Sequence, residues 1–185
     1  MSQSRRKQIR HYDDPGHAHE LTFSCFHNLP LLDTEESCLW LAQSIDTARK
    51  EQQLQLWGYV FMPDHVHLMV CPLRADYSVP RMLLRIKLPA ARKVLGYFRR
   101  TRSVWLGRLA AKKGARTVWH FWQPGPGYDR NVRSVATAAA MIQYMHANPV
   151  RRGLVSRPED WKWPSAGWYA GTRPVPLEVD PVPSW

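Results

Sequence analysis

The stretch Phe61–Val70 reads FMPDHVHLMV and places two histidines on either side of one valine, within a run of β-forming residues. Side chains alternate between the two faces of a strand, so His65 and His67 point to one face and Val66 to the other. Their imidazoles, about 7 Å apart along the strand, can both reach one divalent cation. A lone His-x-His on a strand is more often an exposed polar face than a metal site. Here the flanking runs are apolar, and burying the rings between them without partners would be costly.

A second informative segment, Ala138–Val150, reads AAAMIQYMHANPV. Ala and Met favour helices and no glycine or proline precedes Pro149, so we predict a helix over about 135–147. Pro149 disfavours helical backbone at the preceding residue, which indicates that the helix ends at Asn148. Tyr144 and Asn148 are four residues apart, so a phenol and an amide project from one face of the last turn. Taken alone, this segment is better explained by an ordinary helix in which Tyr144 packs and Asn148 forms a C-terminal turn.

Charge points independently to a nucleic-acid partner. The 185-residue chain has a formal net charge of +11 and no Asp or Glu from Tyr77 to Tyr128. A one-signed stretch is the footprint expected for phosphate binding, and interleaved aromatic rings suit stacking on unpaired bases. A solvated basic helix beside a Trp-rich core is the alternative. The candidate DNA-binding residues are Arg81, Arg85, Lys87, Arg92, Lys93, Arg99, Arg100, Trp122, Arg130 and Arg133.

Together the two motifs resemble one protein family. Tyr59–Leu68 is similar to the His-hydrophobic-His (HUH) motif of the single-tyrosine transposases, and Tyr144–Val155 is similar to their tyrosine motif. Within that superfamily the chain resembles the REP-associated tyrosine transposases. Three further segments are similar to the family. His19–Phe26, followed by Pro30–Leu32, is similar to its first strand. Trp122–Gln123, with Gly127–Asn131 and Arg133, is similar to the segment before the tyrosine helix, and Asp160–Ser165 is similar to its closing motif. The resemblance extends from about residue 19 to residue 169, nearly the whole chain.

This resemblance implies a specific chemistry. It implies that His65, His67 and Asn148 hold Mg²⁺ or Mn²⁺, and that Tyr144 is the nucleophile that forms a 5′-phosphotyrosine bond and frees a 3′-hydroxyl. The metal would polarise the scissile phosphate, and covalent capture would conserve the phosphodiester energy. The sequence contains no Gly-x-x-x-x-Gly-Lys-Ser/Thr phosphate loop, in agreement with a reaction that needs no ATP. By ligand preference alone, this neutral ligand set suits Zn²⁺ or Ni²⁺ better, unless phosphate and water oxygens complete the site.

Three functions remain open at this point. The first is a transposase that cleaves and joins single-stranded or hairpin DNA, including palindromic repeats, as a monomer or homodimer. The second is a DNA-binding protein of the same fold that does not cleave, and the third is a metal-dependent hydrolase with a structural tyrosine. The joint presence of His65, His67, Tyr144 and Asn148 favours the first.

Two further residues compete for the same roles. Tyr128 is a rival nucleophile, but it lies outside the predicted helix, and Val132, four residues on, cannot bind a metal. His146 is a weaker ligand candidate because it lies on a different helix face from Tyr144. Pro126, in the turn before Tyr128, would stiffen a loop that a hinge role would require to move.

The order of predicted elements, β-α-β-β-α-β-α, is an α+β pattern with an antiparallel sheet. The resemblance implies a ferredoxin-like sheet with packed helices. We predict three parts: a loose basic N-terminal arm over 1–18, a single domain over 19–170 and a Pro-rich extended tail over 171–185. The predicted elements are a strand at 19–27, a helix from a capping box at Asp33 and Glu36 to Gln52, a hairpin at 55–71, a helix at 79–98 kinked or split at Pro89, a short helix within 105–113, a strand at 118–122, and the tyrosine helix capped by Ser134.

Cysteine usage and hydropathy indicate the compartment. The three cysteines, Cys25, Cys38 and Cys71, are odd in number and lack metal-type spacing, and those in strand-like runs are typical of reduced core residues. No run of about 18 apolar residues is present, and the basic N-terminus lacks the apolar region of a secretory signal. The sequence therefore predicts a cytoplasmic protein.

Overall fold

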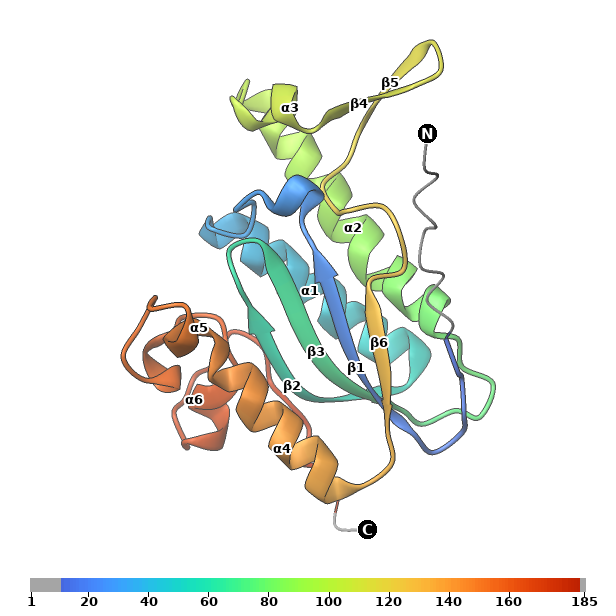
Figure 1. Ribbon diagram of the computed structural model, residues 1–185, viewed down its shortest axis with the longest axis vertical. Helices are drawn as coiled ribbons and strands as arrows, with labels where there is room; N and C mark the ends of the chain where they lie inside the picture. Colours follow the sequence, from blue (N-terminus) through green and yellow to red (C-terminus); the bar gives the residue numbers. More distant parts are fainter. Residues whose placement is uncertain (1–10, 184–185) are drawn as a thin grey trace, which may run out of the picture.

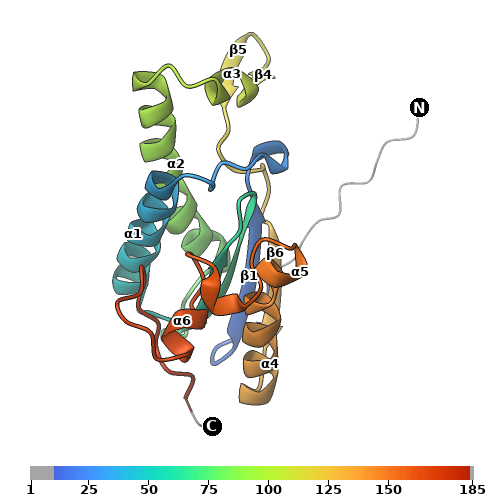
Figure 2. The same ribbon diagram turned by 90° about the vertical axis from the view of Figure 1, so that its left-hand side faces the viewer.

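A four-stranded antiparallel sheet forms the centre of the computed structural model, which describes residues 11–183. Its strands lie in the order β2-β3-β1-β6, where β1 is Ala18–Ser24, β2 is Leu54–Phe61, β3 is His65–Pro72 and β6 is Tyr128–Val132. Helices α1 (Glu35–Gln52) and α2 (Val79–Arg100) cover one face, and α4 (Val135–His146) covers the other (Figures 1 and 2). The predicted α+β class and ferredoxin-like sheet are confirmed.

Short elements surround this framework. A second, two-stranded sheet of β4 and β5 projects from the body beyond the C-terminal end of α2 (Figure 1). The short elements are the 3-10 turn η1 (Phe26–Asn28), α3 (Trp105–Arg108), β4 (Ala110–Lys113), β5 (Arg116–Trp119), α5 (Asn148–Arg151), the 3-10 turn η2 (Pro158–Asp160) and α6 (Ala166–Tyr169).

Strand alternation divides the buried residues into two cores. On β3, Val66 and Leu68 join the larger core beneath α1 and α2, whereas Met69 joins the smaller core beneath α4. The odd-numbered residues of β3, including His65 and His67, therefore face the α4 side, as the period-2 pattern predicts. In the smaller core, the Cβ that Gly58 lacks would lie 3.2 Å from Ile142 Cγ1, so glycine allows α4 to approach β2 closely.

Several predicted elements are correct with small shifts. The hairpin and the two long helices form where expected, and Ser134 caps α4 by accepting from the Thr137 amide. Helix α1 is capped by Thr34, one residue after the predicted Asp33. Of the two outcomes predicted at Pro89, a kink or a split, the split is wrong, because α2 runs through Pro89 without interruption. Packing of α2 against α1 and the sheet outweighs the single hydrogen bond that proline removes.

The segment from 101 to 132 differs most from the prediction. The expected short helix within 105–113 is only one turn long, and Ala110–Lys113 instead pairs with Arg116–Trp119 across a turn where Gly114 has a φ of +61°. The predicted strand at 118–122 ends at Trp119. The fourth strand of the main sheet is Tyr128–Val132, which pairs with β1.

The chain ends contact the domain more than a loose arm and an extended tail would suggest. In the described part of the predicted arm, His11 Nδ1 lies 2.7 Å from Asp129 Oδ2, and Asp13 accepts a hydrogen bond from the Val79 amide. In the tail, Leu177 is buried and Asp180 forms a 2.7 Å ion pair with Arg49. Residues 1–10 and 184–185 lie outside the described residues.

Gly127 fixes the entry into β6 and is expected to be irreplaceable. Its φ is +80°, and an added Cβ would lie 2.4 Å from the Thr22 carbonyl oxygen. Gly127→Ala should therefore lower the free energy of unfolding by about 2 kcal/mol or more, measured by urea denaturation. Gly114→Ala is the matched control, since φ is also positive there but no atom lies within 4 Å. Equal losses in the two variants would contradict the close approach to Thr22.

Candidate active site

The histidine pair lies on β3 directly after the hairpin turn. The turn is closed by a 2.8 Å bond from the Met62 amide to the His65 carbonyl. The ring nitrogens His65 Nε2 and His67 Nε2 are 3.1 Å apart, and the two rings meet edge to face. Both histidines are partly buried, so the strand brings two imidazoles to one point at the sheet surface.

Each histidine is oriented through its other ring nitrogen. His65 Nδ1 lies 2.7 Å from Asp64 Oδ1, and His67 Nδ1 lies 2.8 Å from Thr22 Oγ1 on the neighbouring strand. Asp64 in turn accepts a 2.9 Å charge-assisted bond from Arg152. When Nδ1 donates in this way, the lone pair of Nε2 is left to bind a cation, which is the usual arrangement around metal-bound histidines.

Local electrostatics keep these groups in the required charge states. Burial, aided by the charges of His65 and Arg152, lowers the pKa of His67 to about 4, so its ring is neutral at pH 7. Burial alone would raise the pKa of Asp64, but hydrogen bonds from His65 and Arg152 outweigh it and lower that pKa. A neutral imidazole can bind metal, and an ionised carboxylate can orient its neighbour.

The two histidines fit a divalent cation. Adjacent ligand nitrogens, each about 2.1 Å from a metal, lie about 3 Å apart, which matches the observed separation of the two Nε2 atoms. Among residues 11–183, no group of three or more His, Cys, Asp or Glu side chains is arranged to hold a metal. Asn148, the third predicted ligand, is not one of these residue types. Asn148 donates through Nδ2 to the carbonyls of Tyr144 and Met145, which orients its amide at the end of α4.

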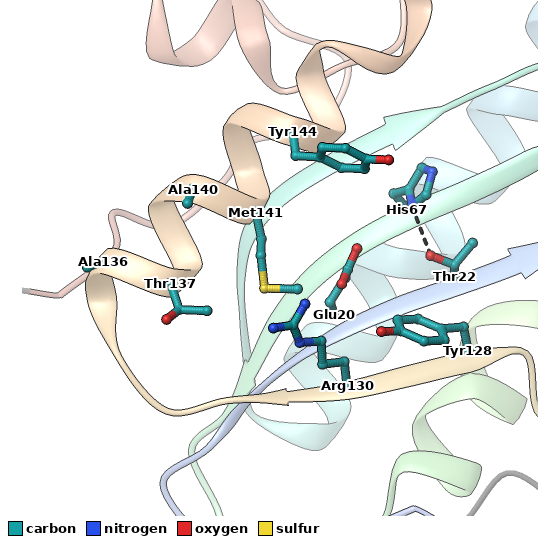
Figure 3. Close-up of a pocket in the computed structure, with 10 residues that line it drawn as sticks. All are labelled: Glu20, Thr22, His67, Tyr128, Arg130, Ala136, Thr137, Ala140, Met141 and Tyr144. Carbon is teal, nitrogen blue, oxygen red and sulfur yellow. Dashed lines mark hydrogen bonds between the residues drawn. The ribbon is translucent and has the colours of Figure 1, made fainter. Parts of the chain in front are cut away.

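Tyr144 and His67 line one cavity of about 850 Å³ between α4 and the sheet. The Tyr144 side chain is 54% exposed, and Figure 3 shows it projecting from α4 with its hydroxyl turned toward His67. The Arg151 guanidinium lies 4.5 Å from the centre of the Tyr144 ring. The fold thus brings together the two motifs that are about 80 residues apart in the sequence.

The opposite side of this cavity carries Glu20, which sequence reasoning did not assign to the site, together with Arg130, a predicted DNA-binding residue, and Tyr128, the rival nucleophile. Glu20 lies across from Arg130 in the strand register, and burial raises the Glu20 pKa, with Arg130 partly opposing the shift. Tyr128 also lines the cavity and is 48% exposed. In Figure 3 its hydroxyl is turned toward Arg130 rather than toward His67.

The ten predicted DNA-binding residues do not form one surface. Arg85 lies 4.0 Å from Glu51, and Lys93 bonds to Gln43, so both reach toward α1. Arg130 lines the cavity of Tyr144. The remaining basic side chains are exposed along α2 or beside β6, except Lys87, which is partly buried; they are Arg81, Lys87, Arg92, Arg99, Arg100 and Arg133.

Trp122 and His146 have packing roles. Trp122 is only 7% exposed, meets Phe23 edge to face and donates to the Lys87 carbonyl, so its replacement would disturb the core and could not isolate base stacking. His146 is buried, and its Nε2 lies 2.7 Å from Ser165 Oγ. Burial lowers the His146 pKa to about 4. This histidine joins α4 to the closing motif.

The strand order and helix placement define a class of fold found in tyrosine transposases. The chain has the fold of a REP-associated tyrosine transposase whose structure contains a bound REP hairpin, with a TM-score of 0.63 and 17% identity over 96% of this chain and 94% of that chain. A candidate transposase from Deinococcus radiodurans R1 aligns with a TM-score of 0.47 and 20% identity, over 75% of this chain and 95% of that one. The resemblance read from the sequence is thus confirmed at the level of the fold.

Comparison of the sequence with family models and with curated proteins gives no match. Within residues 11–183, every helix is too short or too polar to cross a membrane.

Proposed function

We propose that this protein is a metal-dependent enzyme that cleaves and rejoins single-stranded or hairpin DNA through a 5′-phosphotyrosine intermediate on Tyr144. The observation that carries the proposal is the shared cavity, in which the exposed phenol of Tyr144 is turned toward His67. A tyrosine with only a packing role would not need its hydroxyl in a cavity beside an oriented histidine pair. The fold shared with a transposase bound to a REP hairpin supports DNA as the partner.

In this proposal each side chain of the site has a separate role in DNA cleavage. Tyr144 Oη attacks phosphorus and loses its proton, a Tyr–O–P bond forms, the P–O3′ bond breaks, and the departing 3′ oxygen takes up a proton. His65 and His67 would hold the cation with Asn148, while Asp64 and Thr22 fix the two rings. When bound, a divalent cation supplies charge stabilisation at the non-bridging phosphate oxygens.

Tyr128 is the weaker candidate for the nucleophile. It shares the cavity, but its hydroxyl is turned toward Arg130 and it belongs to the edge strand β6. Tyr144 has the Arg151 guanidinium over its ring, a cation that is also available to an approaching phosphate. These differences favour Tyr144.

The experiment that tests the proposal traps the covalent intermediate. A hairpin oligonucleotide with single-stranded flanks is incubated with the protein and Mg²⁺ or Mn²⁺, denatured and separated on a gel. A 5′-phosphotyrosine bond joins the protein to the downstream fragment. A label at the 3′ end should therefore migrate with the protein, and a label at the 5′ end should not. Absence of any adduct from a protein that binds this DNA would favour the non-cleaving alternative.

DNA binding is expected to depend strongly on salt. Log affinity should fall linearly with log salt concentration, with a slope of about −0.7 for each phosphate contacted on a single strand. Replacing Arg92, Arg99 and Arg100 by Gln should flatten this slope, since these exposed side chains lie in the acid-free stretch. Arg74→Gln is the control, because Arg74 is paired with Asp76 at 2.7 Å. If the DNA affinity of the unaltered protein did not change with salt concentration, phosphate binding by this stretch would be contradicted.

A further inference from the structure

A second cavity of about 450 Å³ lies on the α2 side of the sheet, and the proposed reaction does not use it. Its walls are largely apolar and include Leu84 and Leu88, which are 57% and 39% exposed, together with Pro126. Three side chains with polar groups also line it: His11, Lys87 and Trp122. Its volume falls within the range of about 300–1,000 Å³ typical of small-ligand sites.

His11, which lines this cavity, has a ring nitrogen without a hydrogen-bond partner among residues 11–183. Its Nδ1 lies 2.7 Å from Asp129 Oδ2, and with the ring proton on Nδ1 the other nitrogen, Nε2, is an acceptor. That Nε2 atom is buried and has no hydrogen-bond partner among the described residues. A buried acceptor without a donor costs free energy, which a ligand N–H group at this point would recover.

Lys87 presents an unpaired cation in the same cavity. Its Nζ lies 3.4 Å from the Gly125 carbonyl and 5.4 Å from the centre of the Phe23 ring, and no carboxylate of residues 11–183 lies within ion-pair distance. Burial lowers the pKa of this amine. Apart from His11, all lining residues belong to the acid-free stretch, so the charge of Lys87 is available to an anion.

The two cavities flank the same strand. Along β6, Tyr128 and Arg130 line the cavity of Tyr144, whereas Asp129 between them points to the other face and holds His11. The strand order makes β6 the edge of the sheet, and Pro126, two residues before it, lines the second cavity. A nucleic-acid strand crossing this edge would therefore pass from one cavity to the other.

We propose that the second cavity binds one unpaired nucleotide of the DNA strand whose scissile phosphate lies at Tyr144, an inference that rests on the proposed function. The base lies against Leu84 and Leu88 and donates an N–H to His11 Nε2, and the adjoining phosphate pairs with Lys87. The cavity's apolar walls, acceptor and cation match the three chemical parts of a nucleotide. Such a site anchors the strand and gives preference to a base at one distance from the cut.

An abasic scan combined with variants tests this inference by fluorescence anisotropy. Each oligonucleotide in the series is a hairpin with single-stranded flanks and carries one abasic site. Removal of the base at one flank position should lower the affinity for the protein about tenfold. In Leu84→Asn the same abasic site should cost less affinity, because one of the apolar contacts of the base is already lost. Leu73→Asn is the matched control, since Leu73 is 62% exposed and lies outside the cavity. It should retain the full tenfold cost.

Lys87→Met tests the phosphate contact independently of the base contact. It keeps the apolar length of the side chain, and should flatten the salt slope by about 0.7 while preserving the cost of the abasic site. The inference is overturned if no abasic position costs more than twofold, or if the cost is undiminished in Leu84→Asn. If an adduct forms on Tyr144 but the abasic cost does not depend on Leu84, the nucleotide site alone is overturned. If the abasic cost depends on Leu84 but no adduct forms, cleavage alone is overturned. Absence of DNA binding overturns both.

Discussion

Tyr144→Phe is expected to abolish the covalent protein–DNA adduct while leaving fold and DNA affinity nearly unchanged. The substitution removes one hydroxyl from a side chain that is 54% exposed, so little packing is lost. The ring stays available for the Arg151 guanidinium, which lies 4.5 Å from its centre. Without the hydroxyl no Tyr–O–P bond can form, and adduct formation should fall at least about a thousandfold. The measurement is the denaturing-gel assay with a 3′-labelled hairpin oligonucleotide.

Tyr128→Phe is the matched control for this variant. Tyr128 is 48% exposed, lines the same cavity and loses the same single atom. It should still form the adduct, since its hydroxyl is not turned toward His67. The opposite result, an adduct in the Tyr144 variant and none in the Tyr128 variant, would move the nucleophile to β6.

The core of the site could be predicted because its two motifs are local. The period-2 pattern at residues 65–71 and the turn at Pro63 determine which face the histidines share, and neither depends on distant contacts. The tyrosine helix likewise has its own cap, and its apolar side packs on the sheet. Their meeting in one cavity follows from the ferredoxin-like order, which places α4 over β2 and β3.

The residues that sequence reasoning missed act across long chain separations. Thr22 orients His67 from the neighbouring strand, and Arg152 reaches Asp64 from beyond the tyrosine helix. Strand register brings Thr22 to His67, and helix placement brings Arg152 to Asp64. No sequence pattern indicates either contact. Arg152 lies inside the tyrosine motif, Tyr144–Val155, but the motif does not indicate its partner.

Strand β6 was missed for a different reason. Its sequence, YDRNV, has only one aliphatic residue, so it lacks the apolar signal of a buried strand. It forms because an edge strand needs only one partner, β1, and because Asp129 is satisfied by His11 and His19. Both histidines lie more than 100 residues earlier in the chain. Local strand propensity therefore cannot reveal these contacts.

His67→Ala and His65→Ala are expected to remove DNA cleavage, with losses of at least about a hundredfold, and a chelator should do the same to the unaltered protein. The two Nε2 atoms converge to 3.1 Å, so removing either ring leaves a single nitrogen to hold the cation. DNA affinity should change little, since neither ring is cationic when it binds metal. Asn148→Ala should weaken metal use less, because a neutral amide oxygen is the poorer ligand.

Asp64→Asn sharpens this test because it leaves both histidines in place. The carboxylate accepts from His65 Nδ1 at 2.7 Å and is itself held by Arg152. Replacing it should weaken the orientation of His65 and raise the metal concentration needed for half-maximal cleavage by about 10–100-fold, while excess Mn²⁺ restores the rate. His67→Ala should not be restored in this way, because a ligand is missing rather than misoriented. Cleavage that continues undiminished in excess chelator would rule out metal assistance and leave the histidine pair as a structural feature of the hairpin.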